Sequence, residues 1–206
     1  MATTYLTRTP SGSGSQRKFT FSFWVKRSGL SSQQHIFTQY SGSSGDRQFR
    51  IEFQANDTMR IYNTDGGTDW ILFVTNRVFR DSSAWMQIVV AIDTTQSTES
   101  NRVKIYINGS QETSFSTSTY PSLNRDLDIN TTAAQVIGAL SSSSVSSYFD
   151  GSLTHFHFID NTQYQASDFG ETDSTSGIWK PKTAPSVTYG TNGFFLKFEN
   201  SGAMGT

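Results

Sequence analysis

Hydrophobic and polar residues alternate along most of this chain with the period of two that a β-strand requires. The clearest case is the segment 18–26, whose apolar positions are Phe19, Phe21, Phe23 and Val25. Similar patterns predict further strands at His35–Tyr40, Gln48–Phe53, Met59–Asn63, Trp70–Val74, Trp85–Asp93, Val103–Asn108, Gln135–Leu140, Leu153–Ile159 and Phe194–Phe198. Many short strands at close spacing predict an all-β fold, a two-sheet antiparallel β-sandwich.

The connections between these segments are rich in the residues that form tight turns. Asn63-Thr-Asp-Gly-Gly67, Asn108-Gly109 and Asp150-Gly151 place Asn, Asp and Gly where a left-handed backbone can close a turn. The segment Val103–Thr113 carries the strongest hairpin signal, because Asn108-Gly109 separates an alternating run from a polar return. The turns therefore favour antiparallel neighbours.

The strand pattern resumes after every polar stretch, so we expect one domain over residues 1–206. The polar stretches at 111–132 and 141–147 are typical of surface loops. Within the domain we distinguish an N-terminal strand or arm at 1–17, an edge-wrapping loop at 168–190 and a tail at 200–206.

Composition and charge narrow the class of ligand. The chain has 16 basic and 17 acidic residues without a long block of either sign, which argues against a general nucleic-acid or anionic-membrane surface. It has no cysteine, so a disulfide framework and a thiolate zinc site are excluded. We see no export signal, and no apolar run approaches the ~20 residues that span a bilayer. A core is supplied by 16 Phe, 8 Tyr and 4 Trp.

Five segments occur in a telling order along the chain: Phe19–Lys26, Trp85–Asp93, Val103–Gly109, Val136–Ala139 and Phe149–Asp160. This order resembles the laminin-G/pentraxin branch of the concanavalin A-like superfamily. The resemblance covers roughly Phe19 to Phe198 and implies the jelly-roll sandwich of lectins and glucanases. In this interpretation Trp85 opens a strand and plugs the core, and we assign Trp24 and Trp85 to core or edge packing.

Three further segments are Tyr5–Pro10, Phe169–Lys182 and Tyr189–Glu199. They look like parts of laminin-G-like proteins encoded by tailed bacteriophages. This resemblance implies a tail-fibre, appendage or other virion component, present in many copies or as a homo-oligomer. In that group the chain usually continues past the last strand, so the ending after Asn200 is also consistent with a fragment of a longer protein.

Catalysis has little support in the residues. Glucanases of this fold carry a Glu-x-Asp-x-x-Glu strand, and the nearest string here is Glu171-Thr-Asp173-Ser-Thr-Ser176, which lacks the third carboxylate and is typical of a loop. His155 and His157 have a spacing that could ligate a metal, but no third ligand is apparent, and we expect both on a solvent-facing side of their strand. We predict a protein that is not an enzyme.

Sugar binding requires an exposed aromatic ring beside amides and carboxylates that bind hydroxyls. The candidate residues are Tyr40, Asp46, Arg47, Asp69, Trp70 and Tyr120. An equally supported alternative is that Trp70 begins a strand and fills the core.

Calcium is the cofactor to consider, because loop carboxylates bind it in related sandwiches. Asp65 and Asp69 are the candidate ligands, within a wider set of loop aspartates at Asp46, Asp57, Asp126 and Asp128. The alternative is that these side chains cap turns.

Three functions follow as hypotheses. The first is a virion protein that binds a host surface glycan or another envelope component. The second is a capsid or tail decoration protein that binds other virion proteins, and the third is a polysaccharide-degrading enzyme. The pattern of alternation leaves open which end of the sandwich carries the site.

Overall fold

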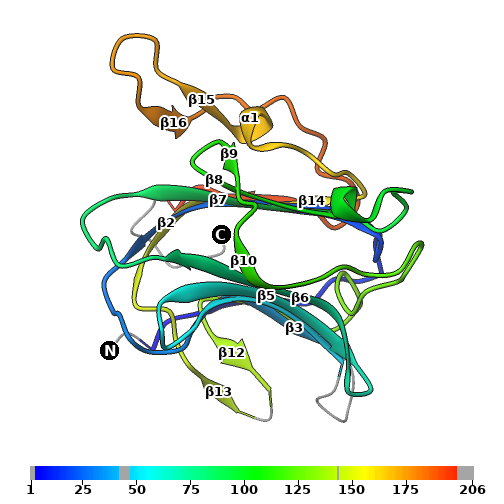
Figure 1. Cartoon of the computed structure of the whole chain (residues 1–206). Helices are drawn as coiled ribbons and strands as arrows, with labels where there is room; N and C mark the ends of the chain where they lie inside the picture. Colours follow the sequence, from blue (N-terminus) through cyan, green and yellow to red (C-terminus); the bar gives the residue numbers. More distant parts are fainter. Residues whose placement is uncertain (1–2, 42–46, 143, 199–206) are drawn as a thin grey trace.

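Two antiparallel sheets pack face to face in the computed structural model, which describes residues 3–41, 47–142 and 144–198 (Figure 1). The seven-stranded sheet has the order β1 (Leu6–Arg8), β11 (Gln135–Ile137), β3 (Gln34–Tyr40), β4 (Gln48–Phe53), β5 (Thr58–Asp65), β6 (Thr68–Val78) and β10 (Phe115–Thr119). The six-stranded sheet has the order β17 (Phe194–Leu196), β14 (Gly151–Asp160), β2 (Lys18–Arg27), β7 (Met86–Asp93), β8 (Val103–Ile107) and β9 (Ser110–Gln111). The predicted all-β sandwich is confirmed.

The smaller elements are two short hairpins and two short helices. One hairpin pairs β12 (Leu140–Ser141) with β13 (Val145–Ser146), and the other pairs β15 (Gly170–Thr172) with β16 (Trp179–Pro181). The helices are a 3-10 turn at Glu99–Asn101 and α1 at Ala166–Phe169. No helix in the described ranges is long and apolar enough to cross a membrane.

Phenylalanine rings from both sheets form the centre of the core. Phe21 on β2 lies 4.5 Å from Phe37 on β3 and 4.8 Å from Phe158 on β14, measured between ring centroids. All three side chains are fully buried. The alternation that predicted a buried face on 18–26 is thus realised as the inner face of a central strand.

Two predicted turns are confirmed by their backbone angles. Gly66 and Gly67 have φ values of 58° and 80° and join β5 to β6, while Asn108 and Gly109 at 47° and 83° join β8 to β9. The prediction for Asp150-Gly151 is wrong. This pair leads into β14, and the Asp150 carbonyl accepts hydrogen bonds from the Ser28 and Gly29 amides.

The polar stretch 111–132 is not wholly a loop, because it contains β10. The strand Phe115–Thr119 pairs with β6 at the edge of the seven-stranded sheet, and most of its residues are exposed. Because β10 lies at the sheet edge and is largely exposed, its Ser and Thr residues do not alternate with apolar ones. The sequence therefore gives no alternation from which this strand could be predicted. The stretch 141–147 likewise contains β13.

The segment 168–190 lies on a face of the sandwich rather than around its edge. Phe169 is buried with Val89 and Ala91 of β7, and Trp179 and Tyr189 pack against the same cluster. Figure 1 shows the β15–β16 hairpin standing above the outer face of the six-stranded sheet. Both faces of β7 are therefore covered, in agreement with its eight buried residues. The predicted tail at 200–206 lies outside the described residues.

Asp160 ties the N-terminal arm to three distant segments. Its Oδ1 accepts hydrogen bonds from the Ser15 amide (2.8 Å) and the Asn130 side chain (2.7 Å), and its Oδ2 accepts one from the Asn192 amide (3.2 Å). Gly14 lies so close that a Cβ there would be 2.2 Å from Asn130 Nδ2. A buried carboxylate with this many donors is well compensated and orders the arm.

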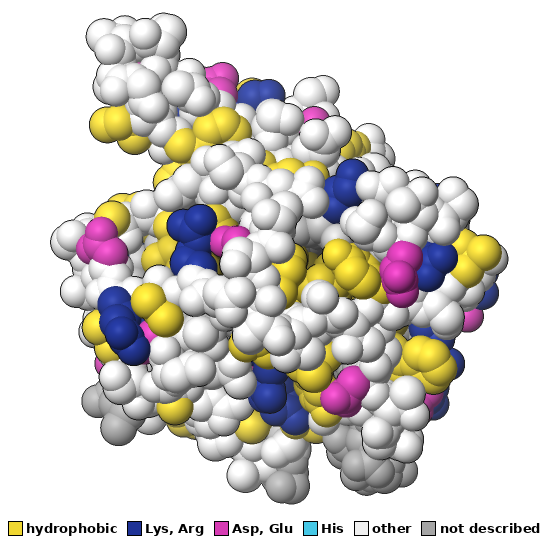
Figure 2. Space-filling model, in the orientation of Figure 1, with side chains coloured by type: hydrophobic (Ala, Val, Ile, Leu, Met, Phe, Trp, Pro, Cys, Tyr) yellow, Lys and Arg dark blue, Asp and Glu magenta, His cyan; other side chains and the backbone are white. Residues whose placement is uncertain are grey.

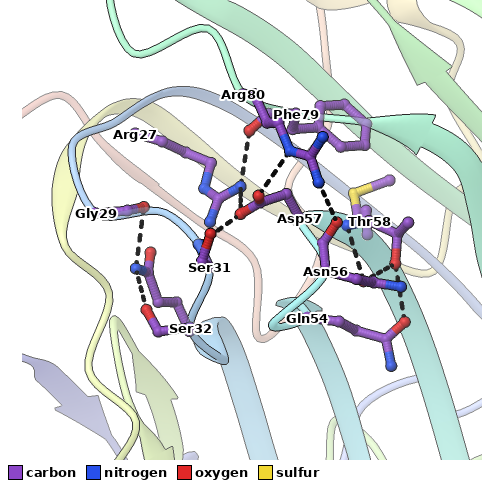
Figure 3. A network of polar contacts seen from close by, with 12 residues as sticks. Arg27, Gly29, Ser31, Ser32, Gln54, Asn56, Asp57, Thr58, Phe79 and Arg80 are labelled. Atoms are coloured by element: carbon purple, nitrogen blue, oxygen red, sulfur yellow. Dashed lines mark hydrogen bonds and ion pairs between the residues drawn. The ribbon is translucent and has the colours of Figure 1, made fainter.

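A buried ion pair closes the opposite end of the sandwich. Arg27 and Asp57 have 0% and 1% side-chain exposure, and Arg27 Nη1 lies 3.1 Å from Asp57 Oδ1 (Figure 3). The Arg27 guanidinium also donates to the Phe79 carbonyl (2.7 Å) and lies 4.4 Å from the Phe53 ring centroid. Asp57 lies in the turn between β4 and β5, as predicted, and calcium at its carboxylate would have to displace both Arg27 and Arg80.

Candidate functional site

A cluster of charged side chains lies where the β3–β4 connection, the β5–β6 turn and the 120–134 segment meet. We call Arg47, Asp65, Trp70, Arg125 and Asp128 the rim site. Asp65 ends β5, Trp70 lies near the start of β6, and Arg47 immediately precedes β4. Gln48 at the start of β4 pairs with Thr64 near the end of β5, which brings these positions to the same end of the sheet.

Two arginines converge on the Asp65 carboxylate. Arg125 Nη2 donates to Asp65 Oδ2 at 2.8 Å, and Arg47 Nε lies 3.2 Å from Asp65 Oδ1. Arg47 Nε also donates to Asp128 Oδ1 at 3.1 Å. The Arg47 side chain is 53% exposed, whereas Asp65 and Arg125 are 26% exposed. The site therefore offers charged hydrogen-bonding groups at its surface.

Trp70 is covered on one ring face by the Arg125 guanidinium, whose Cζ is 3.9 Å from the ring centroid. The indole packs against the hydrophobic core and is partly buried, and Trp70 lies within β6, which begins two residues earlier at Thr68. Trp70 Nε1 and Arg125 Nε are buried and have no hydrogen-bond partner among the described residues. Both groups are donors without an acceptor, and because both atoms are buried a ligand could reach them only if side chains moved.

Asp128 is the buried carboxylate of the site. Burial raises the pKa of Asp128 above its usual value, the charge of Asp65 raises it further, and the charge of Arg47 opposes both. The Asn63 amide donates to Asp128 Oδ2 at 3.4 Å, and the Ser41 hydroxyl donates to Oδ1 at 3.3 Å. Asp128 therefore holds the Arg47 guanidinium in place from the buried side of the site.

The other predicted ligand residues are dispersed. Tyr40 ends β3 next to the rim site, on the outer face of the seven-stranded sheet, and pairs with Gln48 of β4. Tyr120 packs edge-on against Phe73, with ring centroids 4.8 Å apart, and is partly buried. Asp69 is exposed and pairs with Thr64, while Asp46 lies outside the described residues.

The calcium hypothesis finds no ligand cluster in the described residues. No group of three or more His, Asp or Glu side chains there could hold a metal ion. Asp65 is bound by Arg47 and Arg125, and Asp126 forms a bidentate pair with Arg17. Calcium at Asp65 and Asp69 stays a prediction, and binding there would require Asp65 to release its arginines.

The outer face beside Tyr40 carries a row of aromatic and cationic side chains. The Arg50 guanidinium lies 5.6 Å from the ring centroids of both Tyr40 and Tyr62. Glu52 is fully buried between Arg60 and His35, whose Nε2 is 2.6 Å from its Oε2. Burial alone would raise the pKa of Glu52, but His35 and Arg60 outweigh it and hold that pKa below its usual value.

The carboxylates of the glucanase-like string do not form a catalytic pair. Glu171 lies in β15, so the expectation of a loop is wrong for this residue, and Asp173 follows the strand. Both are exposed to solvent or nearly so, and both approach Lys180 Nζ, at 3.8 Å and 2.9 Å. A lysine between two carboxylates holds them as counter-ions.

His157 is buried rather than solvent-facing, which corrects the prediction from its strand. It is 2% exposed, stacks on Phe195 at a centroid distance of 4.1 Å and shares a hydrogen bond of 2.8 Å with the Tyr189 hydroxyl. His155 lies in a register irregularity of β14 with a φ of 46°, so the two histidines do not follow regular alternation.

We expect His157 to make the fold sensitive to acid. Burial, with a smaller effect from the charge of His155, lowers the pKa of His157 from 6.5 to about 4. The unfolded chain takes up this proton near pH 6.5, so the stabilisation is complete above about pH 6.5 and is lost as the pH falls to about 4. The expected loss is about 2–4 kcal/mol.

Urea unfolding at several pH values measures this loss. His157→Phe keeps a stacking ring but cannot titrate, so its stability should fall less between pH 6.5 and 4. His155→Asn should keep most of the loss, because burial of His157 is the main cause. Equal pH profiles for wild type and His157→Phe would contradict the assignment.

The sequence and fold can be compared with known proteins. A laminin-G family model, described as the concanavalin A-like lectin/glucanases superfamily, matches residues 2–166. The chain belongs to this superfamily. The predicted family resemblance is thereby confirmed at the level of the superfamily. No curated protein is similar in sequence to the chain.

Similar solved structures share the fold of this superfamily member at low sequence identity. The heptameric SAP-like pentraxin of Limulus polyphemus has a TM-score of 0.54 and 12% identity, over 94% of this chain and 88% of that one. Domain 4 of the GH43 arabinanase AbnA from Geobacillus stearothermophilus, in complex with arabinotriose, has 0.52 and 15%, over 72% and 63%. The CBM40 domain of the Ruminococcus gnavus IT-sialidase has 0.53 and 13%, over 79% and 95%.

Sequence reasoning missed Arg125 and misplaced Trp85. Arg125 lies 60 residues from Asp65 in the chain, and no local sequence pattern predicts their contact. Trp85 is 40% exposed instead of plugging the core. The alternation along this segment could have predicted the exposure of Trp85. The core-facing residues are the even-numbered Met86, Ile88, Val90 and Ile92, whereas Trp85 has an odd number.

Proposed function

We propose that this superfamily member is a non-enzymatic glycan-binding domain of a tailed-phage virion. It binds a host surface glycan at the rim site. The observation that carries the proposal is the convergence of Arg47, Arg125 and Asp65 at the surface, beside the Trp70 indole. Guanidinium and carboxylate groups bind pairs of sugar hydroxyls, and the exposed Arg47 side chain presents such a group to solvent.

The fold and the phage-like segments support the two parts of this proposal separately. A domain of the same fold, that of the arabinanase AbnA, is known in complex with arabinotriose. The virion role rests on the resemblance of Tyr5–Pro10, Phe169–Lys182 and Tyr189–Glu199 to phage laminin-G-like proteins. Weak binding per site, multiplied by many copies on one particle, would give the avidity that attachment requires.

The experiment is a glycan-array screen with the purified domain displayed multivalently, with calcium and with a chelator. We expect binding to a defined bacterial sugar, and Arg47→Ala should weaken it about tenfold or more. Arg17→Ala is the matched control, because Arg17 is 43% exposed and forms its ion pair with Asp126 at the same end of the sandwich. Its binding should equal that of the wild type.

Loss of binding by Arg47→Ala without a change in Tm would support the rim site. Equal loss by Arg17→Ala would indicate a general charge effect and contradict it. Silence across a broad array, together with stable self-association or capture of another virion protein, would favour the decoration function. Calcium dependence would support the Asp65 and Asp69 ligand hypothesis.

A further inference from the structure

Four side chains form a row across the outer face of the seven-stranded sheet, and none of them belongs to the rim site. We call Tyr40, Arg50, Tyr62 and Arg60 the outer row. Arg50 lies directly opposite Tyr62 on the neighbouring strand, and its Cζ is 5.6 Å from the ring centroids of both Tyr62 and Tyr40. Arg60 Cζ is 5.2 Å from the Tyr62 centroid. The four side chains therefore make one continuous surface.

The strand register explains why these residues meet. Phe49 and Ile51 of β4 and Ile61 of β5 point into the core, so the positions between them point away from it. Directly opposed residues on one face of an antiparallel pair have Cβ atoms about 5 Å apart. The pairing of Arg50 with Tyr62 thus sets the spacing of the row.

The β12–β13 hairpin borders the outer row. Thr38 lies directly opposite Arg50 on β3, and its Oγ1 accepts a hydrogen bond from the Ser141 amide of β12 at 3.3 Å. Figure 1 shows this hairpin projecting from the seven-stranded sheet on the side away from the six-stranded sheet. In the same lower part of Figure 2, Lys and Arg side chains lie among side chains of the hydrophobic class, which there includes tyrosine. The row therefore lies on a face with a raised border.

The outer row carries an excess of positive charge. Glu52 is fully buried beneath it and is approached by Arg60 Nη2 at 2.5 Å and by His35 Nε2 at 2.6 Å. Gln33 Nε2 donates to the same carboxylate at 3.1 Å. Arg50 Nη1 is 4.0 Å away, so Glu52 already has closer partners. One carboxylate beside two guanidinium groups leaves the row with a net positive charge.

Several polar atoms of the outer row have no partner in the described part of the chain. Arg50 Nε donates to Gln48 Oε1 at 2.6 Å, but neither Nη atom of Arg50 donates a hydrogen bond to a described residue. The hydroxyls of Tyr40 and Tyr62 likewise have no partner there. The Arg50 side chain is 15% exposed, and both tyrosines are half-buried. Arg–Tyr contacts across strands use ring faces and aliphatic stems, which leaves these polar edges available to a ligand.

We propose that the outer row binds an acidic saccharide, whose carboxylate accepts two hydrogen bonds from Arg50 and whose hydroxyls bond to those of Tyr40 and Tyr62. The planar guanidinium matches a carboxylate in a bidentate pair, and the net positive charge favours an anion over a neutral sugar. The inference rests on the proposed function only in that the ligand is again a glycan. The row begins beside the rim site, because Tyr40 pairs with Gln48, which directly follows Arg47.

A titration followed by ¹H–¹⁵N correlation NMR locates binding residue by residue. The probes are trigalacturonate and a sialic acid trimer, each compared with its fully methyl-esterified form, which keeps the rings but has no carboxylate charge. We expect saturable shifts of the β4 and β5 amides around Arg50 and Tyr62 with at least one acidic probe. The ester of that probe should bind about tenfold more weakly or not at all.

Three variants test the role of the guanidinium. Arg50→Gln should weaken binding of the acidic probe about tenfold or more. Arg50→Lys keeps the charge without the planar fork, so it should recover part of the affinity. Arg17→Gln is the matched control, because it removes the same charge from a side chain that pairs with Asp126 and immediately precedes β2 in the other sheet. Its affinity should equal that of the wild type, and thermal unfolding verifies that each variant is folded.

Arg47→Ala separates the outer row from the rim site. Binding that is lost in Arg50→Gln and kept in Arg47→Ala would support the row independently of the rim site. Loss in both variants would support one surface that continues from the rim site over the row. Shifts confined to the rim site, lost in Arg47→Ala and kept in Arg50→Gln, would overturn the row and keep the proposed function.

The remaining outcomes would also contradict the outer row. Equal binding of the acid and its ester would show that the carboxylate is not recognised. Equal loss in Arg17→Gln and Arg50→Gln would indicate a general charge attraction. Absence of shifts in β4 and β5 with both acidic probes, and with every acidic sugar that binds on the array, would overturn the proposal.

Discussion

Replacing Asp57 by alanine is expected to lower the free energy of unfolding by about 3–5 kcal/mol, because it leaves the buried charge of Arg27 without its counter-ion. The Arg27 side chain has no exposed surface, and its Nε and Nη2 already have no partner among the described residues (Figure 3). The substitution also removes the acceptor of the Ser31 amide, at 2.8 Å. In the native fold the guanidinium has no exposed surface at which water could replace the lost carboxylate.

Urea denaturation measures this effect, and two variants control for it. Arg80→Ala removes the other arginine from the same carboxylate, but that side chain is 61% exposed, so its loss should cost less than about 1 kcal/mol. Arg27→Met combined with Asp57→Ala removes both buried charges and should recover much of the stability. A loss from Asp57→Ala as small as that from Arg80→Ala would show that the pair is not buried in solution.

Replacing Phe21 by alanine is expected to cost about 3–5 kcal/mol, because the ring lies at the centre of the interface between the sheets. Besides Phe37 and Phe158, it contacts Phe49 and Phe156, with centroids 6.0 Å and 6.1 Å away. The partners lie on three strands of two sheets, so the cavity cannot collapse without moving one sheet against the other.

Equilibrium unfolding of Phe21→Ala, Phe21→Leu and Val78→Ala makes the comparison. Phe21→Leu should be intermediate, since it removes less volume. Val78 lies on β6 and is 45% exposed, so Val78→Ala should change stability by no more than about 0.5 kcal/mol. A Phe21→Ala loss below about 1 kcal/mol would mean that the two sheets are not packed through this ring.

The stability and binding predictions concern different parts of the molecule. The Phe core and the Arg27–Asp57 pair determine whether the sandwich folds, whereas Arg47 lies at its surface. Variants of the second kind are therefore expected to change glycan binding without changing Tm. This separation is what makes the binding experiments interpretable.

The amino-acid sequence by itself determined the fold class, most strands and two of the turns. Alternation of apolar residues places a side chain on one of two faces, and Gly66-Gly67 and Asn108-Gly109 supply the left-handed backbone that hairpins need. Both signals are local, so they can be read without knowing which strands are neighbours. The superfamily resemblance rested on the order of these same segments.

Only the tertiary structure decided which residues meet. Three contacts join segments that no local sequence pattern links. They are Arg125 with Asp65, Arg27 with Asp57 and Trp179 with Gln87. It also decided that Arg125 covers one face of Trp70, and that the segment 168–190 buries His157. Alternation specifies a face but not what packs upon that face, because the covering segment depends on strand order and on long-range contacts.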